Sequence, residues 1–305
     1  NWQLGIIFMI LASSSFAIQD GISRYLANEY NVMMVVMIRY WFFAAFVIVL
    51  ATRKPGGLKT VAKTRQPILQ IARGMLLALE VCVIVLAFTL LGLVESHAIF
   101  ACYPLLVTAL SVPILGEKVG WRRWLAITVG FIGVLIILQP GVNVFSPFAF
   151  LALASALMFA LYSLLTRLAS KRDTTETSFF WTGVSGAVTM TVLGVWYKAS
   201  ALSVLMFSWA VLGVWYWEPI ETVDYFWMLF LCSTAILGHY FLIRCYEASE
   251  VSVVQPFAYL QLIFVTIIGV LVFNETLELN IILGVIIVVT AGLFTFYRSN
   301  KVTSL

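Results

Sequence analysis

The chain has 305 residues, of which 62% are hydrophobic and 10% are charged, and its formal net charge is +4. A soluble domain carries about 25% charged residues, so this composition excludes a chain that covers itself with a polar surface. The mean hydropathy is +1.03, and the apolar runs are continuous. They indicate membrane-spanning helices of about 20 residues and not the alternating strands of a membrane β-barrel.

Apolar runs separated by polar breaks predict ten membrane-spanning helices. In chain order they cover residues 4–24, 33–52, 67–91, 95–115, 120–139, 146–169, 177–197, 224–246, 250–272 and 279–297. The first 17 residues have neither a basic start nor a cleavage site, so we interpret them as part of the first span and not as a signal peptide. The cysteines lie singly within apolar runs and predict neither a disulfide nor a metal site.

The charged residues between the predicted helices are distributed unevenly over the two sides of the membrane. One side receives most of the basic residues, which are Arg53, Lys54, Lys59, Lys63, Arg65, Lys118, Arg122, Arg123, Lys171, Arg172, Arg298 and Lys301. The other side collects the acidic residues Glu29, Glu218, Glu221, Asp224, Glu275 and Glu278. The positive-inside rule therefore predicts a multi-pass protein of the cytoplasmic (inner) membrane with both termini in the cytoplasm.

One further apolar stretch, residues 201–217, follows the seventh predicted helix. A complete span here would move Arg298 and Lys301 to the outer side, against the positive-inside rule. The Trp and Tyr residues of the stretch, next to Glu218 and Pro219, are typical of an interfacial helix. We interpret the stretch as an interfacial or re-entrant segment of the outer face, with a spanning helix as the alternative.

Two short motifs recur along the chain and predict an internal repeat. The pattern FAxxxxx[ST]R begins at Phe16 and again at Phe159, an offset of 143 positions. The sequences LGEKV and FNETL contain Glu117 and Glu275, an offset of 158. The difference of 15 predicts an insertion between these anchors, near 199–222. The chain then divides into a first five-helix repeat (1–141), a second five-helix repeat (142–298) and a cytoplasmic tail (299–305).

An odd number of helices in each repeat predicts that the two repeats cross the membrane in opposite directions. Inverted repeats of this kind build secondary transporters, which bind substrate near the middle of the membrane between the repeats. A duplicated membrane anchor without a transport path is the alternative. Charged residues inside the predicted spans disfavour it, because such residues are costly in a membrane.

One known family is resembled by the stretch YPLLVTALSVPILGEKVGWRRWLAITVGFIGVLIILQPG (103–141), its counterpart QPFAYLQLIFVTIIGVLVFNETL (255–277), the segment Asp20 to Arg24, Arg39 and the pair Arg73-Gly74. This is the EamA-type ten-helix branch of the drug/metabolite transporter superfamily. The resemblance covers nearly the whole chain apart from 199–222. It implies a substrate cavity lined mainly by the first, third, fourth, sixth, eighth and ninth helices, with the fifth and tenth at the periphery.

Glu80 lies at the centre of the third predicted helix among apolar residues. An ionised carboxylate there requires a partner or water and otherwise holds a proton. We predict that Glu80 binds a cationic group or couples a proton, with a protonated glutamate bonded to a neighbouring helix as the alternative. Arg73 precedes it by two turns on the same face, about 10.5 Å away.

Two arginines are candidates for binding a carboxylate or phosphate group by paired hydrogen bonds, Arg39 in the second helix and Arg73 in the third. Headgroup contact or a structural ion pair is the alternative for both. Asp20 and Arg24 lie one turn apart in the first helix. We expect them to pair with each other and to act as an outer gate or a structural lock.

The remaining candidates are polar side chains and prolines inside the spans. His239 and Arg244 lie in the eighth helix, and His239 either carries a proton at physiological pH or packs as a hydrogen-bonded core residue. His97 is expected at the membrane interface. Side chains that bond either substrate or a neighbouring helix are Tyr103, Tyr162, Tyr259 and Gln261. Pro104 and Pro256 interrupt their helices and are candidate hinges.

The sequence thus predicts a secondary transporter that moves a small polar metabolite by alternating access. The family's substrates imply an amino-acid-like, carboxylate or S-adenosylmethionine-like cargo without fixing it. A flippase for a lipid-linked or amphipathic substrate is the alternative. The sequence has no HExxH or serine-nucleophile motif, so no enzyme is expected. We expect no cofactor, metal or nucleic acid; the partners are the substrate and membrane lipids, with coupling to protons or a counter-substrate, in a monomer or homodimer.

Overall fold

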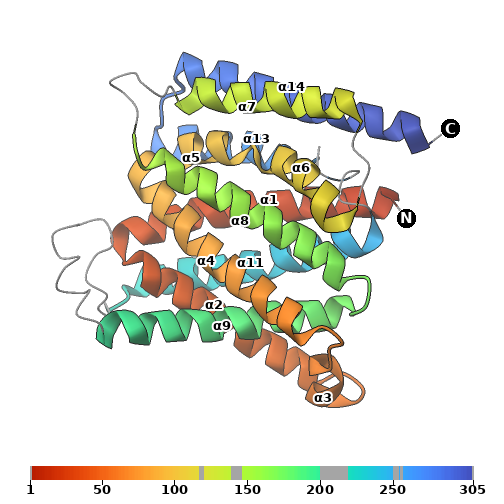
Figure 1. Ribbon diagram of the computed structural model, residues 1–305. Helices are drawn as coiled ribbons and strands as arrows, with labels where there is room; N and C mark the ends of the chain where they lie inside the picture. The colour runs from red at the N-terminus through yellow and green to blue at the C-terminus, as the bar shows by residue number, and fades with distance from the viewer. Residues whose placement is uncertain are drawn as a thin grey trace.

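The computed structural model describes residues 2–116, 120–138, 146–199, 219–249, 254 and 257–303, and all regular structure within these ranges is helical (Figure 1). The helices are α1 (Trp2–Glu29), α2 (Val32–Thr52), α3 (Gly57–Ala62), α4 (Pro67–Leu91), α5 (Leu93–Phe100), α6 (Tyr103–Leu115), α7 (Trp121–Leu138), α8 (Ala149–Ala169), α9 (Thr175–Ala199), α11 (Thr222–Ala248), α13 (Leu260–Phe273) and α14 (Leu279–Thr303).

Most of these helices are long and apolar enough to cross a membrane. Seven described segments meet both conditions: Gln3–Glu29, Val32–Thr52, Pro67–Leu91, Leu93–Leu115, Ala149–Ala169, Thr175–Val195 and Thr222–Ala248. Shorter apolar helices at Trp124–Ile137, Leu260–Phe273 and Leu279–Ala291 lie at the other predicted positions. The prediction of an all-α integral membrane protein is confirmed, whereas the count of ten full-length spans is not exact.

The fourth predicted helix is interrupted between α5 and α6. Ala101 and Cys102 form a turn in which the N–H of Ala101 donates to His97 O at 2.8 Å and that of Cys102 to Ile99 O at 3.2 Å. Pro104 lies in the first turn of α6, where its missing N–H costs no helical hydrogen bond. The candidate hinge at Pro104 therefore coincides with a real break in the helix. The other candidate hinge, Pro256, and the stretch 201–217 lie outside the described residues.

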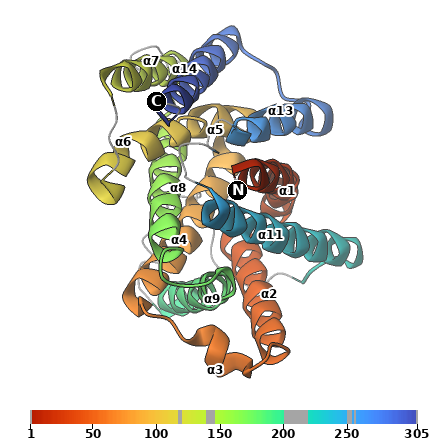
Figure 2. The same cartoon turned by 90° about the vertical axis from the view of Figure 1, so that its right-hand side faces the viewer.

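The helices pack as a bundle with a distinct centre and periphery. Helix α1 lies against α11 and α13, and α4 lies against α8 and α9. Helices α7 and α14 pack against each other at one edge, and α2, α9 and the short α3 lie at the opposite edge (Figure 2). A Cβ atom added to Gly284 would lie 2.7 Å from the carbonyl oxygen of Gly133, so these two backbones are in direct contact. The peripheral place of α7 and α14 agrees with what the family resemblance implies.

The turn between α1 and α2 is attached to the start of α11 by buried polar contacts. The hydroxyl of Tyr30 donates to the Asp224 carboxylate at 2.7 Å and accepts from the N–H of Glu221 at 3.0 Å. Asn31 caps α2 by accepting from the N–H of Met33 at 2.8 Å. These contacts fix the relative positions of α1, α2 and α11, which supply three walls of the cavity at the centre.

Candidate functional site

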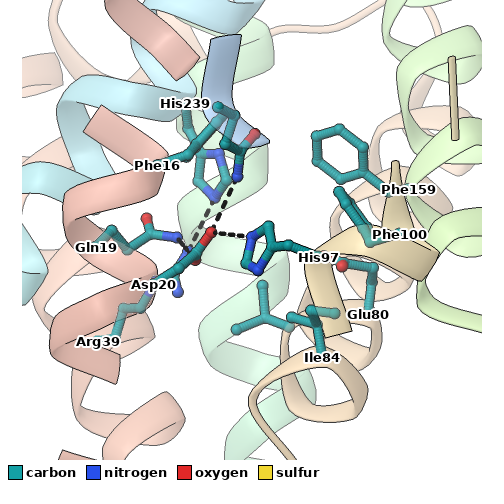
Figure 3. A pocket seen from close by; sticks show the side chains of 12 residues that line it. Phe16, Gln19, Asp20, Arg39, Glu80, Ile84, His97, Phe100, Phe159 and His239 are labelled. Atoms are coloured by element: carbon teal, nitrogen blue, oxygen red, sulfur yellow. Dashed lines mark hydrogen bonds and ion pairs between the residues drawn. The ribbon is translucent and has the colours of Figure 1, made fainter. Parts of the chain in front are cut away.

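A polar cavity lies at the centre of the bundle, where α1, α2, α4, α5, α8, α11 and α13 meet. We call it the central cavity; its lining consists of Phe16, Gln19, Asp20, Arg39, Glu80, Val81, Ile84, His97, Phe100, Phe159, His239 and Gln261 (Figure 3). The cavity volume is about 30 Å³, which is large enough for water and too small for a metabolite. The side chains therefore nearly fill the cavity, and a metabolite requires them to move apart.

Glu80 contributes a buried carboxyl group to the wall of the central cavity. It comes from the middle of α4 and is 3% exposed. Ser155 of α8 donates a hydrogen bond of 2.6 Å to its Oε1 atom. Among the described residues, no basic side chain forms an ion pair with Glu80. Its carboxyl group is therefore available to a cationic group or a proton that enters the cavity.

Arg39 of α2 contributes a guanidinium group to another side of the same cavity. Its guanidinium is buried, and its Nη2 atom donates to Nε2 of His239 at 3.3 Å. Among the described residues, no carboxylate forms an ion pair with it. Because Nε2 of His239 accepts this hydrogen bond, the ring is neutral and carries its hydrogen on Nδ1, which has no partner in the described part of the chain. The ring packs between Phe16 and Phe43, with centroid distances of 5.1 and 5.9 Å.

Asp20 lies at the centre of a hydrogen-bonded group that joins α1, α5 and α13. Its Oδ2 atom is 3.0 Å from Nε2 of His97 and accepts from Nε2 of Gln261 at 3.0 Å, and its Oδ1 atom accepts from Gln19 at 3.0 Å. His97 is 3% exposed and lies in the wall of the cavity, so its predicted place at the membrane interface is wrong. The break between α5 and α6 explains the difference, because it places α5 as a separate short helix inside the bundle.

The predicted pair of Asp20 and Arg24 does not form. Arg24 instead forms an ion pair with Glu275, just beyond the end of α13, and stacks over the ring of Phe273 at 4.2 Å. The carboxylate of Glu275 also accepts hydrogen bonds of 2.7 Å from the backbone N–H groups of Leu93 and Val94. Negative charge at a helix N-terminus is stabilised by the free N–H groups there. In place of the ion pair predicted within α1, these contacts join α1, α5 and the segment that follows α13.

Arg73 lies outside the lining of the central cavity, and we revise its predicted binding role to a structural one. It is 0% exposed, and its guanidinium donates to Gln70, Tyr162, Thr166, Thr182 and the carbonyl oxygen of Ser178. These partners come from α4, α8 and α9. A guanidinium that is already saturated by protein groups has no free donors for a substrate, so Arg73 holds three helices together.

The other predicted residues divide between the surroundings of the cavity and its exterior. Gln261 lines the cavity, and the ring of Tyr103 contacts Phe100 and Phe159 at centroid distances of 5.0 Å each. Tyr162 faces Arg73. The hydroxyl of Tyr259 is buried without a hydrogen-bond partner in the described part of the chain. Arg244 is half-exposed and pairs with Glu247 at 3.2 Å, away from the cavity.

Sequence reasoning missed the three phenylalanines of the lining and Gln19. The sequence does indicate that Phe16 and Gln19 lie beside Asp20, because the three residues follow an i, i+3, i+4 pattern and share one face of α1. Phe100 and Phe159 have no such signal, since apolar residues are common throughout these helices. Within the described ranges, no group of three His, Cys, Asp or Glu side chains is arranged to hold a metal ion.

Comparison with known proteins agrees with this architecture. The EamA-like transporter family matches the chain twice, over residues 3–139 and 146–297. An S-adenosylmethionine uptake transporter of Rickettsia prowazekii is 24% identical over 97% of this chain and 94% of its own length. A riboflavin transporter of Vibrio cholerae is 25% identical over 97% and 94%.

More distant relatives extend the likeness. A pseudopaline exporter of Pseudomonas aeruginosa is 22% identical over 94% of each chain. A solved crystal structure that is 14% identical shares the fold with a TM-score of 0.64, over 98% of this chain and 97% of that one. The related transporters are named for small metabolites, which supports a small-metabolite transporter here. The two matches to the family together cover nearly the whole chain, so the chain belongs to the EamA-like transporter family.

Proposed function

We propose that this protein is a secondary transporter that moves a small zwitterionic metabolite across the cytoplasmic membrane by alternating access, with S-adenosylmethionine as the best-fitting cargo. The observation that carries the proposal is the presence of Arg39 and Glu80 in the wall of one cavity. Both are buried, their ionised forms carry opposite charges, and neither is ion-paired among the described residues.

Burial makes this arrangement selective for a ligand with two charges. A buried charge without an opposite partner is costly, and a ligand that supplies the partner recovers that cost. Arg39 presents the planar fork that binds a carboxylate by two parallel hydrogen bonds. Glu80 is suited to an amine or another cationic group.

The apolar part of the lining supports the same class of substrate. The aromatic rings of Phe16, Phe100 and Phe159 line the cavity beside the charged groups. Aromatic faces bind both flat rings and cations. S-adenosylmethionine combines an amine, a carboxylate, a cationic sulfonium and a flat base, so each part of the lining has a group to receive.

The narrowness of the cavity supports alternating access. A space that the side chains nearly fill cannot admit such a molecule unless the helices around it separate. We propose that the segments 1–141 and 142–298 are inverted repeats that rock against each other, as in other transporters built from such repeats. The contacts of α1 with α11 and α13 would then change during transport.

The test is uptake and counterflow in proteoliposomes with S-adenosylmethionine, riboflavin and methionine as probes. Arg39→Gln and Glu80→Gln should each weaken S-adenosylmethionine binding at least about tenfold, since each removes a charged hydrogen bond. Arg53→Gln and Glu29→Gln change the same residue types at exposed positions and should leave binding unchanged. Unchanged affinity in both cavity variants would rule out zwitterion recognition.

A second candidate function is a flippase for an amphipathic substrate. A mostly apolar cavity of about 290 Å³ lies between α2, α9 and α11 and has the exposed pair Lys54 and Glu176 in its lining. An acyl chain suits the apolar walls, and a polar headgroup suits the ion pair. Movement of a lipid-linked sugar, with no movement of the three soluble probes, would favour this function over the first.

A further inference from the structure

His97 and Asp20 meet in the wall of the central cavity in a geometry that constrains their hydrogen atoms. The carbonyl oxygen of Leu93 lies 3.1 Å from Nδ1 of His97 and can only accept, so Nδ1 carries a hydrogen. On the other side of the ring, Nε2 lies 3.0 Å from Oδ2 of Asp20. A carboxylate also only accepts, so one further proton lies between these two atoms.

The surroundings of Asp20 place this proton on the histidine. Asp20 already accepts from the side-chain amides of Gln19 and Gln261, and donors around a carboxyl group favour its ionised form. His97 is then an imidazolium that donates to Leu93 on one side and to Asp20 on the other. Phe88 stacks on the ring with a centroid distance of 4.9 Å and holds its orientation.

We propose that His97 and Asp20 form a proton-binding site in the cavity wall and that the loss of its proton weakens the link between α1 and α5. This inference rests on the proposed function for its role in transport, because the site lies in the same cavity as Arg39 and Glu80. The proton itself is bound whether or not S-adenosylmethionine is the cargo.

The consequence of deprotonation follows from the two contacts of the ring. A neutral imidazole has a single N–H, so it can donate to Leu93 or to Asp20 but not to both. In the contact that loses its hydrogen, two acceptor atoms then face each other at about 3 Å. If the remaining hydrogen stays on Nδ1, the contact between His97 of α5 and Asp20 of α1 is lost; if it stays on Nε2, the ion pair with Asp20 becomes a weaker hydrogen bond from a neutral donor. In both cases removal of the proton to cavity water weakens the link between α1 and α5, while Gln261 of α13 still bonds to Asp20.

Other charged groups face this site from the neighbouring helices. Glu80 comes from α4 and Arg39 from α2, and both line the same cavity. The neutral ring of His239 comes from α11 and faces Arg39. The lining residue from α8 is Phe159, which carries no charge, and α13 supplies Gln261. A cationic substrate group near Glu80 would repel the imidazolium and favour release of its proton.

The direct test is nitrogen NMR of histidine-labelled protein in lipid nanodiscs. The chain has only two histidines, so the His239→Gln variant leaves His97 as the sole signal. At about pH 7, where free histidine is mostly neutral, both ring nitrogens of His97 should carry a proton. Asp20→Asn should leave one of them unprotonated, and the matched change Glu29→Gln at the exposed end of α1 should not. A single unprotonated nitrogen in the protein with Asp20 intact would overturn the proposal.

A transport experiment tests the coupling separately. Accumulation of S-adenosylmethionine is compared with and without a pH gradient, and the ratio of the two is the readout. Glu29→Gln should keep the ratio of the unmodified protein, and His97→Gln should reduce it to one, whatever its absolute rate. A ratio that survives in His97→Gln overturns the coupling. If S-adenosylmethionine is not moved at all, the proposed cargo fails, and the NMR result still decides on the proton site.

Discussion

Arg24 of α1 and Glu275, just after α13, form an ion pair that joins two segments separated by most of the chain. The same carboxylate accepts from the first N–H groups of α5, so three helices meet at one side chain. Glu275 belongs to the repeated motif found in the sequence. Its counterpart Glu117 lies outside the described residues.

Replacement of Glu275 should loosen this end of the bundle. Glu275→Gln removes the ion pair with Arg24 and weakens the cap of α5. Charge-assisted hydrogen bonds contribute roughly 1.5–3 kcal/mol, so the equilibrium constant for local opening of α5 should rise about tenfold or more. The measurement is the rate of thiol labelling of Ser96→Cys, a fully buried position in α5, in protein whose own cysteines are replaced. Glu29→Gln, at the exposed end of α1, is the control and should leave the rate unchanged.

Substitution of Arg73 should affect stability and not substrate recognition. Arg73→Gln leaves several buried acceptors without a donor, at a cost of about 1–3 kcal/mol for each unsatisfied group. The thermal unfolding temperature should fall clearly, and Arg73→Lys should not restore it, because an ammonium lacks the planar fork. Arg244→Gln, at the half-exposed pair with Glu247, should change stability by about 0.5 kcal/mol or less. A stable Arg73→Gln protein with a large loss of ligand affinity would contradict the structural role.

The contact of α7 with α14 should not tolerate a methyl group at Gly284. A Cβ atom there would lie 2.7 Å from Gly133 O and 2.3 Å from a carbon of Ile137, so one helix must shift. Overpacking costs about 1–3 kcal/mol, which exceeds the gain in helix propensity from alanine. Gly284→Ala should lower the unfolding temperature in detergent. Gly120→Ala, where no atom lies within 4 Å of the added carbon, should not. Equal unfolding temperatures for Gly284→Ala and the unmodified protein would show that α7 and α14 shift apart at no cost in stability.

Asp173, in the loop between α8 and α9, should make stability depend on pH in the acid range. Burial, the largest influence, acts to raise its pKa, but hydrogen bonds from Thr64, Gln70 and the N–H of Arg65 together lower the pKa below its ordinary value of 3.8. A carboxyl group whose pKa is lower in the folded state than in the unfolded state stabilises the folded state at pH values above the unfolded-state pKa. This stabilisation is lost as the pH falls through the folded-state pKa.

The check is thermal unfolding of the protein and of Asp173→Asn from about pH 7 to pH 3. The unmodified protein should be more stable than the variant near neutral pH, and the two should converge toward pH 3. Glu29→Gln is the matched control and should follow the unmodified protein. A constant difference at all pH values would mean that the carboxylate charge is not what stabilises this loop.

The sequence predicted what depends on the chain's local composition. Long apolar runs must form helices in a membrane because their backbone groups need internal partners, so the positions of the spans followed directly. Glu80 and Arg39 were found because a charge inside a span is rare. Their meeting in one cavity depends on how the helices pack, which no local pattern records.

The errors have the same origin. Asp20 and Arg24 have the spacing of a helical ion pair, yet each found a stronger set of partners on other helices. The prediction for His97 assumed one continuous helix over 95–115. The turn before Pro104 instead makes α5 a separate helix within the bundle, and the sequence did not show that this helix would be capped from α13.

Helix α5 is only eight residues long, and two of the contacts described above act on it. Glu275 holds its first N–H groups, and Asp20 holds His97 one turn later. Thermodynamic linkage requires that two events which bias the same segment influence each other by equal factors. If His97 and Asp20 bind a proton as proposed, weakening the contacts between Glu275 and α5 must therefore also alter the contact between His97 and Asp20, and a change at His97 must alter the contacts of Glu275. The short helix thus joins the ion pair of Arg24 and Glu275 to the proposed proton site, and the ring-nitrogen NMR signals of His97 in Glu275→Gln would report the connection.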